Sequence, residues 1–276
     1  MKIKELIAYG RKMLNENNIE DSNIIAKSLA KYILEMDDSK IIINEDKEVE
    51  ENNRIRYYLS LIEIVDGRPL QYITNKQNFM GLEFYVDENV LIPQPDTEIL
   101  VEEVINACKS FDEVHVLDIC TGSGAIGISI AKNVNDATVT LSDISNKALE
   151  IAKKNAKQND VNVSFIESDM FENISEKFDI IVSNPPYIKT EVIQTLDKGV
   201  QNEPYIALDG GKDGLDFYRI LVEKSKEYLN NGGMLIMEIG YDQKEDVEKL
   251  LVDSGYSDVY SKKDLSGNDR IVAAKI

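Results

Sequence analysis

The sequence predicts an α/β protein in which a parallel, doubly wound sheet follows a small helical domain. Strand-like and helix-like segments alternate with short links over the second half of the 276-residue chain, and this order requires parallel strands with helical crossovers. The earlier part shows apolar residues at helical spacing instead. The composition, 43% hydrophobic and 29% charged, is typical of a soluble protein with a sizeable core.

Residues 1–74 are expected to form the helical domain. After Ser22, one helical face carries the apolar side chains Ile25, Leu29, Tyr32, Ile33 and Met36. Residues 3–14 and 52–65 show similar spacing. Three helices are therefore expected here.

Residues 75–95 are expected to join the two domains through a β-hairpin. Asp87-Glu88 predicts the turn, because it separates two strand-like runs, residues 79–86 and 89–92. Pro93-Gln94-Pro95 then ends the second strand, since proline cannot donate to a ladder.

Residues 96–276 are expected to form the α/β domain. Asp96 predicts the N-cap of a first helix that runs to about Lys109. Seven strands follow, at 114–119, 137–142, 162–166, 178–183, 234–239, 257–262 and 270–275. The expected helices among them are 124–132, 145–157, 213–229 and 242–254. The last helix opens with a capping-box-like Asp242-Gln243-Lys244-Glu245 and ends at Gly255.

The charge of the chain argues against direct contact with nucleic acid. Of the net −19, residues 76–276 carry −16, from 20 basic and 36 acidic side chains. Such a surface repels phosphate backbones, whereas it suits a basic protein partner or simply solubility. No apolar run is long enough to cross a bilayer, and the amphipathic start differs from a signal peptide. We expect a cytoplasmic protein that does not bind membranes.

Histidine and cysteine usage predicts no metal site and no Ser-His-Asp triad. Cys108 and Cys120 lack metal-ligand spacing. The one histidine, His115, lies inside the apolar run 114–117 and is expected to be a strand residue without a catalytic role.

A glycine-rich turn follows the strand at 114–119. Gly122, Gly124 and Gly127 let the backbone pass close to a ligand and turn into a helix, but their spacing also fits a dinucleotide fingerprint. Asp143 ends the next strand, where a carboxylate can accept both hydroxyls of a ribose. Asp169 follows the third strand and is placed to meet an adenine amino group.

Acidic residues at three successive strand ends, Asp118, Asp143 and Asp169, resemble the S-adenosylmethionine-dependent methyltransferases. The resemblance implies a class I, Rossmann-like fold with a seven-stranded, mostly parallel sheet. It also implies S-adenosyl-L-methionine as cofactor and S-adenosyl-L-homocysteine as product. The cofactor-binding residues would be Asp118, Cys120, Thr121, Gly122, Ser123, Gly124, Asp143, Asp169, Met170 and Asn184.

The run Asn184-Pro185-Pro186-Tyr187 follows the fourth strand at the same edge. The Asn184 amide oxygen and the Pro185 carbonyl provide two acceptors in fixed relation, which match the two N–H donors of a planar NH2 group. The Tyr187 ring can cover the conjugated system to which that NH2 belongs. Holding both N–H bonds directs the nitrogen at the sulfonium methyl group. Asn184, Pro185 and Tyr187 are therefore predicted to be catalytic, and all four residues to bind substrate.

Nearly the whole chain resembles the HemK-type peptide chain release factor N5-glutamine methyltransferases. The residues that carry the resemblance are Gly67–Ile73, Phe79, Gly81, Phe84, Val90–Glu98, Asn184–Tyr187, Glu203-Pro204, Ala207-Leu208, Gly210-Gly211, Asp213–Leu215, Glu238–Gly240 and Asp264–Arg270. It implies methyl transfer to the glutamine of the Gly-Gly-Gln loop of class I release factors. The chain departs from the family at Cys120, usually glycine, at Gln94, usually arginine, and at Met170, often aromatic.

Two other functions remain open from the sequence. One is an amino methyltransferase that acts on adenine N6 or guanine N2 of nucleic acid, for which a basic recognition domain is lacking. The other is an adaptor that binds S-adenosylmethionine without catalysis. We expect a monomer whose helical domain recognises the protein substrate.

Overall fold

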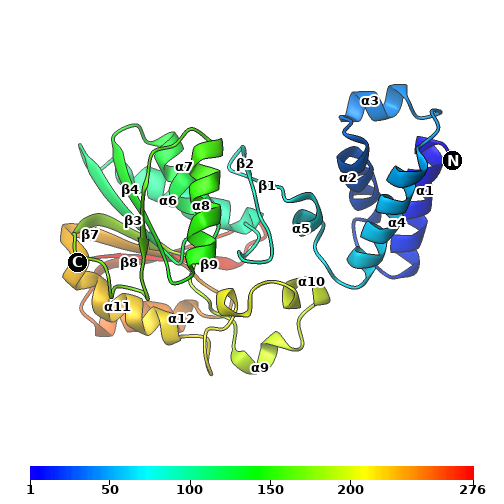
Figure 1. The fold of residues 1–276 in the computed structure, drawn as a ribbon. Coiled ribbons are helices and arrows are strands. Elements are labelled where there is room, and N and C mark those ends of the chain that lie inside the picture. The colour runs from blue at the N-terminus through cyan, green and yellow to red at the C-terminus, as the bar shows by residue number, and fades with distance from the viewer. The chain divides into compact units, whose positions relative to one another are not determined.

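The computed structural model describes all residues from 1 to 276 and divides them into two compact units (Figure 1). The first, which we call the helical unit, contains Met1–Asn75 and the short segment Asp197–Asn202. The second, the sheet unit, contains Lys76–Leu196 and Glu203–Ile276. No helix in either unit is both long and apolar enough to cross a bilayer.

The helical unit packs its helices around one apolar core. Its elements are α1 (Ile3–Glu16), α2 (Ser22–Leu34), α3 (Asp38–Ile43), α4 (Glu51–Val65), α5 (Leu70–Thr74) and α10 (Lys198–Gln201). Leu6, Leu29 and Leu61 are fully buried in the core, as the helical spacing of apolar residues requires. The three long helices confirm the sequence prediction, whereas the short α3, α5 and α10 were not predicted.

The sheet unit contains a seven-stranded sheet in the order β5-β4-β3-β6-β7-β9-β8. Its strands are β3 (Val114–Ile119), β4 (Ala137–Asp143), β5 (Ser164–Glu167), β6 (Phe178–Ser183), β7 (Leu229–Glu238), β8 (Ser257–Lys263) and β9 (Asp269–Lys275). β9 pairs antiparallel with both of its neighbours, β7 and β8, and the other pairs in the sheet are parallel. The predicted Rossmann-like, mostly parallel sheet is confirmed, and His115 is a residue of β3.

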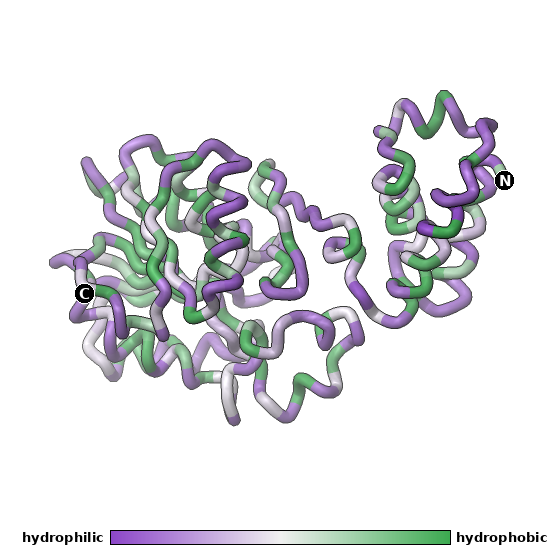
Figure 2. Tube along the Cα trace, viewed as in Figure 1, coloured by the Kyte–Doolittle hydropathy of each residue, from purple (hydrophilic) through white to green (hydrophobic).

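Helices cover both faces of this sheet. One face packs against α6 (Glu98–Cys108), α7 (Ala125–Asn133) and α8 (Asn146–Gln158), and the other against α11 (Asp216–Tyr228) and α12 (Lys244–Asp253). Along β3, Val114 and Val116 enter the first core while Leu117 and Ile119 enter the second. Figure 2 shows green strands between helices striped in purple and green, the pattern of a two-sided core.

The predicted hairpin lies earlier in the chain than expected. Strands β1 (Gln77–Phe79) and β2 (Leu82–Phe84) pair antiparallel around a turn at Met80-Gly81, so the prediction of a turn at Asp87-Glu88 was wrong. Both turn residues have positive φ, 50° and 73°. The Asp87 carboxylate instead accepts from the Asn89 amide at 2.9 Å and holds a local loop.

Two predicted helix starts also differ. Asp96 is not an N-cap, because it lies inside the 3-10 turn η1 (Pro95–Thr97) that precedes α6. Gln243 does not act in a capping box either. Its buried side chain points back into the unit, where Nε2 donates to the carbonyl oxygens of Tyr187 and Gly214, both at 3.0 Å.

The strand order reverses between β3 and β6, which are neighbours although they are not consecutive. Open α/β sheets bind ligands in the crevice outside the carboxyl ends of the strands at such a switch point. The long connection from β6 to α11 includes α9 (Thr190–Ile193) and the 3-10 turn η2 (Tyr205–Ala207), neither of which was predicted. Together these features place the candidate site.

Candidate active site

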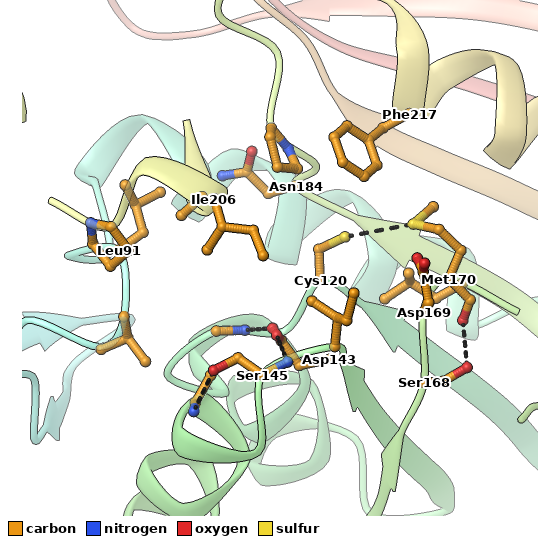
Figure 3. Close-up of a pocket in the computed structure, with 18 of the residues that line it drawn as sticks. Leu91, Cys120, Asp143, Ser145, Ser168, Asp169, Met170, Asn184, Ile206 and Phe217 are labelled. Atoms are coloured by element: carbon orange, nitrogen blue, oxygen red, sulfur yellow. Dashed lines mark hydrogen bonds between the residues drawn. The ribbon is translucent and has the colours of Figure 1, made fainter. Parts of the chain in front are cut away.

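A cavity of about 370 Å³ opens at the carboxyl ends of β3, β4 and β6 (Figure 3). Its lining combines three of the predicted acidic and glycine positions with residues of the run Asn184–Tyr187, which we call the acceptor motif. An apolar wall completes the lining. The polar part includes Gly122, Asp143, Ser145, Ser168, Asp169 and Asn184. The apolar part includes Leu91, Ile119, Met170, Pro186, Ile206 and Phe217. This mixture suits a ligand with both a flat apolar portion and hydroxyl groups.

The glycine loop turns from β3 into α7 at one wall of this cavity. Gly124 is the N-cap of α7 with φ 82°, and a Cβ built on it would lie 2.7 Å from Ile128 Cδ1. Only glycine fits this position. Gly122 lines the cavity, whereas Thr121, Ser123 and Gly124 lie behind it as the frame of the loop.

Asp118 lies beneath the loop and holds it. The side chain is fully buried, and its Oδ2 accepts from Thr121 Oγ1 at 2.5 Å and from the Gly127 amide at 3.0 Å. Oδ1 has no hydrogen-bond partner. Burial raises the pKa of Asp118 to about 7, against the lowering effect of these two donors. Asp118 does not line the cavity, so its predicted contact with the cofactor stays a prediction while its contact with the loop is direct.

Asp143 ends β4 at the cavity wall. Its Oδ2 accepts from the Gly122 amide at 2.8 Å and its Oδ1 from the Ser145 amide at 2.9 Å. Burial raises its pKa, whereas the backbone donors oppose this shift. Each carboxylate oxygen keeps a second lone pair, so the group can accept the two hydroxyls of a ribose from a fixed position.

The side chains of Cys120 and Met170 lie next to each other. Both stand at positions where this chain departs from the family that it resembles. Cys120 has φ 61° and Met170 φ 46°, both in the left-handed region, and their sulfur atoms lie 3.9 Å apart. Burial raises the pKa of the Cys120 thiol, which stays protonated. The positive φ gives the physical reason why glycine suits position 120, and it means that cysteine there carries backbone strain. Asp169, beside Met170, is exposed at the cavity.

The acceptor motif crosses from the cavity into the interior. Asn184 and Pro186 line the cavity, while the Tyr187 hydroxyl turns away from it and donates to Glu238 Oε1 at 3.4 Å. Asn184 Nδ2 donates to Thr97 Oγ1 at 3.4 Å. Pro185 is buried behind the cavity wall. The structure therefore brings Asn184 and Pro186 to the cavity and leaves the predicted cover by the Tyr187 ring as a prediction.

Several residues that support the site were not assigned a role from the sequence. They are Thr97, Asn155, Glu238, Gln243 and Arg270. Thr97 lies 87 positions before Asn184 and Arg270 lies 86 positions after it, so no local spacing connects either residue to the motif. Two signals were available: Thr97, Glu238 and Arg270 stand in segments that carry the family resemblance, and Glu238 is a polar residue after the apolar run Met234–Met237. No group of three or more His, Cys, Asp or Glu side chains is arranged to hold a metal ion.

The fold and the sequence match those of methyltransferases. Residues 94–254 match the family model of the methyltransferase small domain, and residues 5–74 match that of the PrmC N-terminal domain. A methyltransferase from Pyrococcus furiosus superposes with a TM-score of 0.53 at 20% identity, over 82% of this chain and 98% of that one. The T. thermophilus 16S rRNA N2 G1207 methyltransferase, solved with AdoMet and guanosine, gives 0.53 at 19% identity, over 72% and 49%. The protein is a Rossmann-like methyltransferase.

Similar sequences narrow the class to one family. The release factor glutamine methyltransferase of Clostridium acetobutylicum is 42% identical over 284 residues, which cover 99% of this chain and 98% of that protein. The protein of the same name from Geobacter sulfurreducens is 37% identical, over 99% and 96%. The chain belongs to the release factor glutamine methyltransferase family, as its resemblance in sequence predicted.

Proposed function

We propose that the protein transfers a methyl group from S-adenosylmethionine to the side-chain amide nitrogen, N5, of the glutamine in the Gly-Gly-Gln loop of class I peptide chain release factors. One observation carries the proposal: Asn184 lines the same cavity as Gly122, Asp143 and Asp169. An acceptor for a planar NH2 group thus lies beside groups suited to an adenosyl cofactor. Family membership supports the same reaction.

The cavity residues fit S-adenosylmethionine. Asp143 would accept the ribose hydroxyls, the Gly122 backbone would pass along the amino acid portion, and Asp169 with Met170 would contact the adenine. Ile119 and Phe217 provide apolar surface for a flat ring. When bound, this cofactor supplies an electrophilic methyl group on sulfonium.

The methyl acceptor, an amide nitrogen, is a weak nucleophile because its lone pair is delocalised. The chain's own residues can compensate for this. No hydrogen bond within the protein uses Asn184 Oδ1, so this oxygen is available to accept one N–H of the glutamine amide. The Pro185 carbonyl would accept the other. Both acceptors orient the nitrogen and stabilise the positive charge that develops on it, and one N–H proton is lost to water as the methyl group is added.

The two compact units support a division of labour. We assign recognition of the release factor to the helical domain, residues 1–74, and catalysis to residues 96–276, with residues 75–95 as linker. The protein would act as a monomer in the cytoplasm, where its substrate is made. Removal of residues 1–74 should raise the KM for the release factor and leave cofactor binding unchanged.

A labelled-methyl transfer assay tests the proposal. Purified class I release factor is compared with a copy whose Gly-Gly-Gln glutamine is replaced, and label should enter only the first. Asn184→Ala should abolish transfer without loss of cofactor binding measured by calorimetry. Label on neither factor, followed by label on DNA or RNA in the same assay, would establish the adenine or guanine amino group as the acceptor instead.

A further inference from the structure

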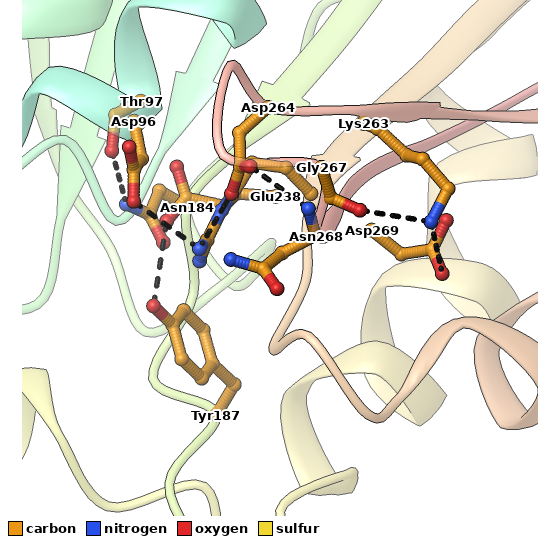
Figure 4. Close-up of polar contacts among 11 residues, drawn as sticks. Asp96, Thr97, Asn184, Tyr187, Glu238, Lys263, Asp264, Gly267, Asn268 and Asp269 are labelled. Carbon is orange, nitrogen blue, oxygen red and sulfur yellow. Dashed lines mark hydrogen bonds and ion pairs between the residues drawn. The ribbon is translucent and has the colours of Figure 1, made fainter.

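A layer of buried polar side chains lies behind the acceptor motif, away from the cavity (Figure 4). Its members come from three segments: Thr97 from η1, Glu238 from the end of β7, and Arg270 from the start of β9. Thr97 and Glu238 are 4% and 2% exposed. Each of these two contacts one side chain of the motif, Thr97 with Asn184 and Glu238 with Tyr187.

Thr97 determines which end of the Asn184 amide faces the cavity. Because its Oγ1 accepts from Asn184 Nδ2 at 3.4 Å, the amide oxygen is left for the ligand. If the amide were rotated by half a turn, its own N–H donors would face the N–H donors of the substrate NH2 group, and no hydrogen bond could form. The orientation of this one side chain thus decides whether the site attracts or repels its substrate.

Glu238 in turn requires the Tyr187 hydroxyl to be a donor. An ionised carboxylate can only accept hydrogen bonds. Its Oε1 accepts from the Tyr187 hydroxyl, and Oε2 has no partner at hydrogen-bonding distance. The Tyr187 hydroxyl therefore gives its hydrogen to Glu238, and this bond sets the tilt of the Tyr187 ring.

The charges around Glu238 set its protonation. Burial raises its pKa to about 7, while the nearby Thr97 hydroxyl, the Arg270 guanidinium and the Tyr187 hydroxyl lower it, and Asp96 raises it. Arg270 is itself held by Asp264 Oδ2 at 3.0 Å and Asp96 Oδ2 at 3.3 Å. The carboxyl group is therefore poised to change charge near neutral pH.

We propose that Thr97 and Glu238 are positioning residues that fix the polarity of the Asn184 amide and the tilt of the Tyr187 ring. Thr97 orients Asn184 with its oxygen toward the cavity, and ionised Glu238 holds the Tyr187 hydroxyl as a donor. When Glu238 is protonated it gains an O–H donor of its own and accepts less strongly, so the Tyr187 ring loses its preferred tilt. The inference rests on the proposed reaction, because it assumes that the ligand at Asn184 is an NH2 group.

The consequences differ from those of a merely structural role. Methyl transfer should fall as the pH drops through about 7, the pKa at which Glu238 gains its proton. Asp118 has a similar pKa but lies under the glycine loop, so its titration would change cofactor binding instead. Measuring cofactor affinity at each pH separates the two groups.

The experiment compares Thr97→Val, which removes the hydroxyl at nearly constant volume, with Thr97→Ser, which keeps it. Thr97→Val should lower kcat about tenfold, the effect of one neutral hydrogen bond expressed in the transition state. The cofactor Kd and the melting temperature should stay close to those of the wild type, and Thr97→Ser should recover most of the rate. Glu238→Gln should give a low kcat without the loss below pH 7. Equal rates for the Val and Ser variants, or an unchanged pH profile in Glu238→Gln, would overturn the proposal.

A second readout does not depend on the substrate. The ring signals of Tyr187 in ¹³C-labelled protein should shift with pH with a midpoint near 7 in the wild type, and they should be insensitive to pH in Glu238→Gln. The side-chain NH2 signals of Asn184 should be displaced in Thr97→Val. If these shifts occur but release factor is not methylated, the proposed reaction fails and the positioning role stands. If release factor is methylated and the signals do not respond, the positioning role fails alone.

Discussion

Asn155 of α8 binds the backbone of Tyr85 through both of its polar groups. Its Oδ1 accepts from the Tyr85 amide at 2.7 Å, and its Nδ2 donates to the Tyr85 carbonyl at 3.0 Å and to the Ser123 carbonyl at 2.9 Å. One fully buried amide thus ties the chain after the hairpin to the glycine loop. The two segments can be displaced only together.

Replacing Asn155 with leucine should therefore destabilise the protein and loosen the cofactor loop. Three backbone groups lose their partner, and unpaired buried polar groups cost about 1–3 kcal/mol each before relaxation or water entry. We expect the free energy of unfolding in urea to fall by about 2–4 kcal/mol. Gln158→Ala is the control, since Gln158 donates to the Glu83 carbonyl from an exposed position on the same helix. A similar loss in both variants would contradict the special role of Asn155.

Gly210 should tolerate no side chain, because it lies against the acceptor motif. A Cβ there would lie 2.7 Å from Tyr187 Cα and 2.9 Å from the Pro186 carbonyl oxygen. Gly210→Ala should displace the motif by about 1 Å and lower kcat by about 10²-fold, the cost of such misplacement. Gly199→Ala, where nothing lies within 4 Å, is the matched control and should retain full activity. Unchanged kcat in Gly210→Ala would mean that the motif does not have to be held in place.

Cys120→Gly should relieve backbone strain at the cavity. The left-handed conformation costs a non-glycine residue about 1–2 kcal/mol, and the greater freedom of glycine in the unfolded chain offsets about half of it. We expect a gain of up to about 1 kcal/mol in stability and tighter binding of S-adenosylhomocysteine in calorimetry. Cys120→Ala keeps the strained backbone and should show neither gain. Equal behaviour of the two variants would assign any effect to the thiol.

The raised pKa of Asp118 predicts that the stability of the protein depends on pH. This pKa rises from 3.8 to about 7 on folding, so between these values the folded state binds the proton more strongly. The free energy of unfolding should consequently decrease as the pH rises from about 4 to about 7 and level off above that. The Asp118→Asn variant can keep the bonds from Thr121 and Gly127 without a charge to bury. The difference in the free energy of unfolding, variant minus wild type, should therefore be larger at pH 8 than at pH 5.5. Urea unfolding at the two pH values checks this, and a constant difference would contradict it. Glu238 contributes with the same sign, so Glu238→Gln is measured beside it.

The fold was predictable because its signals are local. Alternating strands and helices predict the parallel sheet, and a glycine run after a buried strand predicts the loop at Gly122. The family resemblance rests on motifs such as Asn184–Tyr187 and the segment around Pro93, which can be recognised without knowing what they contact. These signals led to the correct sheet and family, and to the edge of the sheet at which the cavity lies.

The supporting contacts were not predictable because they join distant segments. Gln243 looked like part of a helix cap, yet its amide binds the Tyr187 carbonyl 56 residues away. The hairpin turn was misplaced because Asp87-Glu88 has stronger turn chemistry than Met80-Gly81, and the pairing of Phe79 with Leu82 against the core decided the register instead. Tertiary packing overrode local preference in both places.

The direction of β9 has a consequence for how the protein is made. Because this strand runs against its neighbours, its first residue lies at the same edge as the last residue of β7, and Arg270 reaches Asp96 across 174 positions of sequence. During synthesis, the glycine loop and the acceptor motif emerge from the ribosome well before Arg270 can join them. The polar layer behind Asn184 is thus assembled last, and a nascent chain that ends before residue 270 has the motifs of the enzyme without a completed site.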